Sequence, residues 1–161
     1  MGRRARDQVT GVVERDEVFI GNETRGRVGG AKDKTAAMTA VESLPGRRLG
    51  RVRMEISPLA GSAALVEFAQ AVIAPGSTIR TDGARHLRVL SDLGYQHEYF
   101  VGLNSTVPAH VNLPGVHLVG SLLKRWLTGT LHYAASPAHL AYYQDEYTFR
   151  FNRRTAKARG L

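Results

Sequence analysis

The chain has 161 residues, enough for one domain whose core needs no disulfides, and it contains no cysteine. Thiolate zinc sites and cysteine nucleophiles are therefore excluded, and no apolar run is long enough to cross a membrane or to form a signal-peptide core, so we expect a cytoplasmic protein. The net charge of +8 is concentrated in four clusters, at residues 3–6, 25–34, 47–53 and 150–159, and this pattern favours a polyanionic partner, most simply nucleic acid.

The first third of the chain predicts three strands. Residues 12–21 form a β-rich run with acidic residues at its centre. The glycine-rich, charged stretch 22–35 does not suit regular structure and is interpreted as a mobile basic loop. Residues 36–42 form a short apolar strand, and residues 51–56 alternate charged with apolar side chains in the period-two pattern of a strand with one wet face. The short connections indicate an antiparallel meander.

The middle of the chain predicts two more strands, each of which follows a helix. A helix capped by Ser62 precedes a short strand at residues 77–82, and a second helix at residues 85–93 precedes a strand at residues 95–101. Strands that follow helices join a sheet in parallel through right-handed crossovers. We therefore expect both strands to run parallel to the strand they join.

The last third of the chain predicts a polar loop and two helices. The loop spans residues 104–114, and the first helix spans residues 116–127 with Gly129 just beyond its end. The second helix begins at Pro137, a favoured first helical position, and runs to about residue 154. The predicted fold class is α/β, with a five-stranded mixed sheet flanked by helices.

Two aspartates lie where ligands bind in such sheets. Asp16 is on the first strand, among apolar residues, where a carboxylate costs free energy unless a positive group meets it. Asp82 ends the fourth strand, beside the first, at the sheet edge that commonly binds ligands. Carboxylates on neighbouring strands suit a divalent metal. The alternatives are a solvated Asp16 on a wet strand face and a turn-forming Asp82 before Gly83.

The two C-terminal helices offer further candidate side chains. His117 and Lys124 are seven residues apart, two turns along one helix face, and a metal ligand with a cation beside it suits a phosphodiester. A lone helical histidine is more often structural or exposed. In the last helix, Glu146, Arg150 and Arg153 form a charged stripe, which either supports the site, binds DNA or is an ordinary surface ion pair.

Several motifs recur together in one protein family. They are VVERDEVFIG, the loop GRVGGAKDK, AVE, GSTIRTDG, LLKRWLTGT and HLAYYQDEYTFRFNRR. With them the sequence resembles the catalytic domain of bacterial insertion-sequence DDE-class transposases, in the ISXO2-like group of the IS1595 family. The resemblance covers residues 11–154, leaving basic tails at residues 1–10 and 155–161. It implies an RNase H-like fold that cuts and rejoins DNA.

The resemblance also implies roles for individual residues. Asp16 and Asp82 match the first two catalytic acids, His117 the third metal ligand and Lys124 the lysine seven residues later. Two Mg²⁺ or Mn²⁺ ions are implied, as are a homo-oligomer on DNA and a place at the bacterial nucleoid. The residues expected to bind DNA are basic, and they are Arg25, Arg27, Lys32, Lys34, Lys124, Arg125, Arg150 and Arg153.

Two features depart from the family pattern. The third ligand is commonly Glu or Asn, and histidine shifts metal preference toward manganese or zinc; His110 and Asn112 are fallback ligands, and Glu98 is a weaker one. Relatives usually carry a DNA-recognition region before the first catalytic strand, whereas here that strand already begins at residue 12. We therefore expect a truncated element. The alternatives are therefore an RNase H-like nuclease without strand transfer and an inactive remnant that binds DNA.

Overall fold

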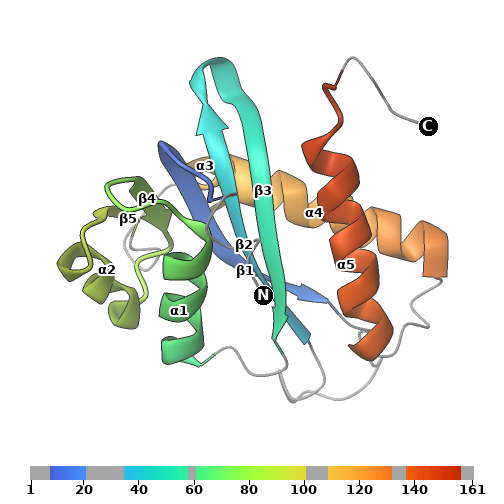
Figure 1. Cartoon of the computed structure of the whole chain (residues 1–161), viewed down its shortest axis with the longest axis horizontal. Coiled ribbons are helices and arrows are strands. Elements are labelled where there is room, and N and C mark those ends of the chain that lie inside the picture. Colours follow the sequence, from blue (N-terminus) through green and yellow to red (C-terminus); the bar gives the residue numbers. More distant parts are fainter. Residues whose placement is uncertain (1–7, 21–34, 58–60, 101–108, 132–136, 157–161) are drawn as a thin grey trace.

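The structure is a computed structural model that describes residues 8–20, 35–57, 61–100, 109–131 and 137–156 (Figure 1). The basic loop predicted at residues 22–35 lies almost wholly outside the described residues. The same is true of four predicted DNA-binding residues, Arg25, Arg27, Lys32 and Lys34.

A five-stranded mixed sheet in the order β3-β2-β1-β4-β5 forms the centre of the fold. Its strands are β1 (Val12–Ile20), β2 (Thr35–Leu44), β3 (Arg48–Ser57), β4 (Thr78–Thr81) and β5 (Gln96–Tyr99). The first three strands form an antiparallel meander, and β4 runs parallel to both β1 and β5. The predicted mixed sheet is confirmed, and β1 is its central strand.

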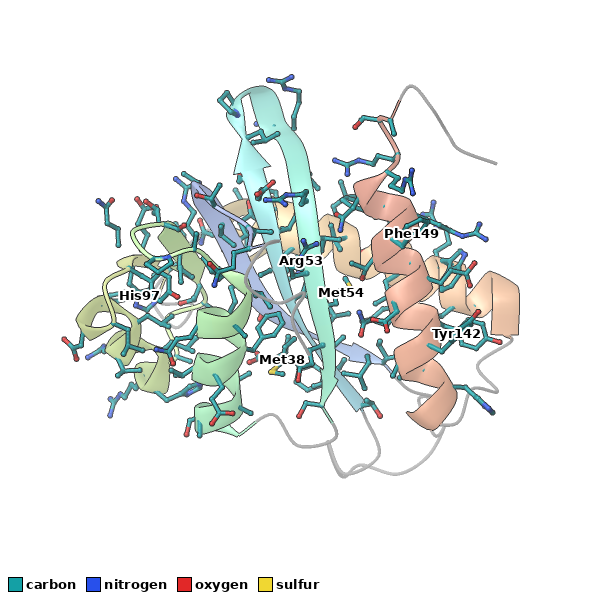
Figure 2. All side chains as sticks on the ribbon, in the orientation of Figure 1. Met38, Arg53, Met54, His97, Tyr142 and Phe149 are labelled. Carbon is teal, nitrogen blue, oxygen red and sulfur yellow. The ribbon has the colours of Figure 1, made fainter. Side chains whose placement is uncertain are left out.

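Helices cover both faces of the sheet (Figure 1). They are α1 (Ser62–Val72), α2 (Val89–Asp92) after a 3-10 turn at Arg85–Arg88, α3 (Ala109–Asn112), α4 (Pro114–Leu131) and α5 (Pro137–Asn152). One core lies between α1 and the sheet and contains Met38, whereas the other lies under α4 and α5 and contains Met54 (Figure 2).

The alternation of side chains along β1 divides its residues between these two cores. Val13 belongs to the core under α1, and Val18 belongs to the core under α4 and α5. Because successive strand residues point to opposite faces, Glu14 and Asp16 share the face of Val18. Asp16 therefore lies on the side of the sheet that α4 covers.

Several boundaries differ from the prediction, and three of the differences bear on the helices. Gly61, not Ser62, is the N-cap of α1, and no side chain caps that helix. The loop predicted at residues 104–114 contains the short helix α3. Helix α4 begins at Pro114, a favoured first position, and runs through Gly129, since an interior glycine costs a helix only about 1 kcal/mol. Among the described helices, none is both long and apolar enough to cross a membrane.

Candidate active site

The register of β1 against β4 brings the two aspartates together. Its paired positions are Val12 with Thr78, Val13 with Ile79 and Glu14 with Arg80. Each pair differs by 66 (78 − 12 = 66), which is also the separation of the aspartates (82 − 16 = 66). Continued by two residues, this register places Asp82 beside Asp16, directly after β4 ends at Thr81.

The environment of Asp16 disfavours its charged form. Burial raises the pKa of Asp16 above its ordinary value, and the negative charges of Glu17 and Asp82 raise it further. The Glu17 backbone N–H donates to Asp16 Oδ1 at 2.8 Å and lowers this pKa, as does His117. A partly buried carboxylate beside a second acid is a place where a bound cation relieves an electrostatic cost.

His117 approaches Asp16 from helix α4. Its Nε2 lies 3.8 Å from Asp16 Oδ2, and the His117 side chain is 40% exposed. The Nε2 atom itself is buried and has no hydrogen-bond partner among the described residues. Two ligand atoms that each lie about 2.1 Å from one metal ion are roughly 3–4 Å apart. Asp16 and His117 therefore fit a shared divalent ion with little movement.

The charge of Asp82 acts on Asp16, but the Asp82 side chain is not turned toward Asp16 and His117. Its side chain is exposed, and Oδ1 accepts a hydrogen bond from the Ala84 N–H at 3.2 Å. The turn-forming interaction, which is the alternative role of Asp82, is thus present. Within the described ranges, no three histidine, aspartate or glutamate side chains form a ready-made metal cage. Asp82 would have to turn away from Ala84 to join Asp16 and His117 around an ion.

Glu14 fixes the start of α4 beside the candidate site. This residue is 1% exposed, and its Oε2 accepts the Val116 N–H at 2.9 Å. A carboxylate at a helix N-terminus pairs with unsatisfied N–H groups and with the positive end of the helix dipole. The sequence interpretation missed Glu14, although strand alternation puts it on the face of Asp16. This contact places His117, the residue after Val116, next to β1.

Two glycines let α4 lie close to the sheet. A Cβ on Gly115 would lie 2.9 Å from Glu14 Oε2, and a Cβ on Gly120 would lie 2.8 Å from Val18 Cγ2. Both distances are shorter than a normal contact, so a side chain at either position would push the helix outward. His117 lies between these close approaches, and its distance from Asp16 depends on them.

Glu17 lies on the other face of the sheet. Its Oε1 is 3.0 Å from Nη2 of Arg15, whose side chain is only 1% exposed. The predicted exclusion of Glu17 from the site follows from this orientation. The Arg15–Glu17 ion pair belongs to the α1 side of the sheet.

Four of the predicted DNA-binding residues lie at the two C-terminal helices, two on α4, one on α5 and one directly after α5. Lys124 and Arg125 are exposed on α4. On α5, Nη2 of Arg150 lies 2.6 Å from Oε1 of Glu146, and the Arg153 guanidinium lies 5.0 Å from the Phe149 ring. Helix α5 packs beside β3, two strands away from β1 (Figure 1). Support of the site by the stripe on α5 stays a prediction.

The fallback ligands have other surroundings. Nε of Arg80 lies 2.7 Å from Oε2 of Glu98, and Asn112 is half-buried on α3. His110 is also in α3, but its side chain lies outside the described part of the chain. Glu98 is therefore committed to an ion pair, whereas His117 presents an unpartnered nitrogen to Asp16.

Comparisons with known proteins agree with this architecture. A family model described as the ISXO2-like transposase domain matches residues 8–152. The fold is similar to the solved catalytic core domain of BIV integrase, with a TM-score of 0.53 and 14% sequence identity over 95% of this chain and 88% of that chain. This likeness confirms the predicted RNase H-like fold. At 14% identity it shows the fold alone. The comparison with curated proteins gives no match.

Proposed function

Because the chain belongs to the ISXO2-like transposase family, we propose that it cuts DNA and transfers the cut strand, using divalent metal ions held by Asp16, Asp82 and His117. The observation that carries this proposal is the approach of His117 Nε2 to within 3.8 Å of Asp16 Oδ2. Asp82 stands beside them and raises the Asp16 pKa through its charge. Two of the three candidate ligands, Asp16 and His117, thus lie close together although they come from separate parts of the sequence.

The residues of the site have distinct tasks in this proposal. A divalent ion supplies a Lewis acid and a more acidic bound water when it is present. Asp16 and His117 hold it from β1 and α4, and Asp82 turns inward from β4 to complete the ligand set. The imidazole of His117 favours Mn²⁺ over Mg²⁺, because it is a softer ligand than a carboxylate.

DNA binding follows from the charge around the site. Lys124 lies two turns along α4 from His117, about 10 Å away by helix rise, and binds a phosphate near the cut. Phosphates farther along the DNA backbone are bound by the predicted residues of the basic loop, Arg25, Arg27, Lys32 and Lys34. Joining two element ends requires two active sites, so the protein acts as an oligomer on DNA.

A plasmid-nicking assay with Mn²⁺ tests the proposal. Asp82→Asn is expected to abolish cleavage and to leave DNA binding unchanged, since the substitution removes one ligand charge from an exposed position. Asp92→Asn is the matched control, because Asp92 is also exposed but lies on α2 away from the site. Unchanged cleavage by Asp82→Asn would remove Asp82 from the site.

A second assay separates strand transfer from cleavage alone. The protein is incubated with pre-cut element ends and a plasmid, and only a transposase yields joined products. Cleavage without joined products supports an RNase H-like nuclease. Failure to cleave with Mn²⁺, together with binding that weakens steeply as salt rises, supports a remnant that only binds DNA.

A further inference from the structure

A cavity of about 650 Å³ lies directly beside the candidate active site. Each candidate ligand has a neighbour two positions earlier in the cavity wall: Glu14 before Asp16, Arg80 before Asp82 and Gly115 before His117. On a strand, residues two apart share a face and are about 7 Å apart. The cavity therefore begins about 7 Å from the carboxylates, on the same side of the sheet.

The walls of this cavity include exposed apolar side chains. Leu44, Val111 and Leu118 come from β2, α3 and α4, and they are 40%, 55% and 52% exposed. Ser43 and Asn112 also line the cavity and supply a hydroxyl and an amide. Apolar surface that gathers around one hollow, with a few polar groups, is typical of a ligand site, and the volume is in the usual range of about 300–1,000 Å³.

Three charged side chains line the cavity: the carboxylate of Glu14, which accepts the Val116 N–H, and the two arginines. Arg47 is exposed in the turn between β2 and β3, and Arg80 is on β4, where Glu98 pairs with it. A second copy of this chain would bring a further net charge of +8 toward these arginines. A nucleotide instead offers a phosphate for an arginine, a flat base for apolar walls and polar edges for the hydroxyl and the amide.

We infer that this cavity binds an unpaired nucleobase of the DNA strand whose backbone crosses the candidate active site. The inference rests on the proposed function, because that function brings a phosphodiester to Asp16 and His117. A base that leaves the stack beside the cut enters the cavity between Leu44 and Leu118, and its phosphate remains near Arg47. Unstacking costs a few kcal/mol and is cheapest for a base that is already unpaired.

Methyl NMR with short oligonucleotides tests the occupant directly, without metal and without cleavage. The protein carries labelled leucine and valine methyl groups, and the probe is a mixed-sequence single strand of eight nucleotides. The expected result is that the methyl signals of Leu44, Val111 and Leu118 shift. Those of Val89 and Leu93, which are exposed on or after α2 and outside the cavity, are expected to stay in place.

An abasic oligonucleotide separates base binding from phosphate binding. It keeps the phosphates and lacks the bases, so it is expected to leave the three cavity signals unshifted. The double variant Leu44→Ala and Leu118→Ala loses apolar contact area with the base, so it is expected to bind the intact strand roughly tenfold more weakly and the abasic strand equally well. Leu93→Ala is the matched control, because Leu93 is 36% exposed, close to the 40% of Leu44, and does not line the cavity. It is expected to bind as the wild type does.

Four outcomes would overturn the inference. Equal shifts with the abasic strand would show a phosphate site only, and unchanged affinity of the double variant would show that the walls do not contact a base. Cavity signals that shift with protein concentration in the absence of DNA would show an interface between copies. Asp82→Asn distinguishes the two proposals, because it should abolish cleavage and keep the shifts. A wild-type protein that cleaves DNA without shifting these signals would disprove only the base site, and shifts without cleavage would disprove only the proposed function.

Discussion

The contact of α4 with β1 at Gly120 sets how near His117 comes to Asp16, and Gly120→Ala tests it. A Cβ on Gly120 would lie 2.8 Å from Val18 Cγ2 and 3.2 Å from Val18 Cγ1. Carbon atoms pack at about 3.5–4.0 Å, so the substitution requires a movement of about 0.7 Å (3.5 − 2.8). Val18 is buried and β-branched, so its side chain has no easy rotation away. The helix must move instead.

The magnitude follows from two opposing effects. Overpacking of a core by one methyl group costs about 1–3 kcal/mol, whereas replacing a helical glycine by alanine gains up to about 1 kcal/mol. Gly120→Ala is therefore expected to lose about 1 kcal/mol of unfolding free energy. Gly129→Ala on the same helix is the matched control, because a Cβ there meets no described atom within 4 Å. It is expected to gain up to about 1 kcal/mol.

Urea unfolding followed by the fluorescence of Trp126 measures both variants. This is the only tryptophan of the chain, and it lies on α4 itself. The helix-propensity gain is common to both substitutions, so the difference between the variants isolates the overpacking, about 1–3 kcal/mol. Gly120→Ala should also reduce metal-dependent cleavage, since the helix carries His117 away from Asp16. Equal stabilisation by both substitutions would refute the close contact and its role in placing His117.

Three further predictions concern Glu14, Tyr147 and His117. Glu14→Gln should lower the unfolding free energy in urea by about 1 kcal/mol, because the charged cap of the Val116 N–H becomes neutral; no loss would argue against the cap. Burial raises the pKa of Tyr147 to about 12, so its neutral form stabilises the fold fully below pH 10, and about 3 kcal/mol is lost as the pH rises to 12. Tyr147→Phe should flatten this fall when unfolding is measured from pH 9 to pH 12, and a fall as steep as that of the wild type would contradict it. His117→Glu should shift the metal preference in cleavage assays from Mn²⁺ toward Mg²⁺, and an unchanged preference would exclude His117 as a ligand.

Local patterns were sufficient to predict the sheet and the pair of aspartates. The alternation in residues 51–56 and the helices before β4 and β5 are properties of short windows, and they determine strand type and direction. The separation of Asp16 from Asp82 equals the offset of the β1–β4 register, so their adjacency follows once the two strands pair. Both strands and their order were therefore accessible from the sequence.

Long-range contacts were not accessible in this way. The hydrogen bond from Val116 to Glu14 joins residues that are 102 positions apart, and no local periodicity predicts such a pair. The start of α4 at Pro114 was missed for a different, local reason, since the polar residues before it predicted a loop and obscured the favoured first-position proline. Ser62 was assigned as a cap from its residue type, but Gly61 occupies that position.

The seven-residue spacing of His117 and Lys124 shows that they share a helix face, but not which way that face is turned. The packing of α4 decides it. Val116, Val119 and Leu123 are buried against the sheet, whereas His117 is 40% exposed and Lys124 is exposed. The shared face therefore lies where the buried side of the helix meets solvent, so His117 reaches Asp16 while Lys124 remains open to a phosphate. A rotation of α4 by one residue, about 100°, would destroy this arrangement. The hydrogen bond from Val116 to Glu14 and the close contact of Gly120 with Val18 hold the helix against such a rotation, so they matter to the chemistry as well as to stability.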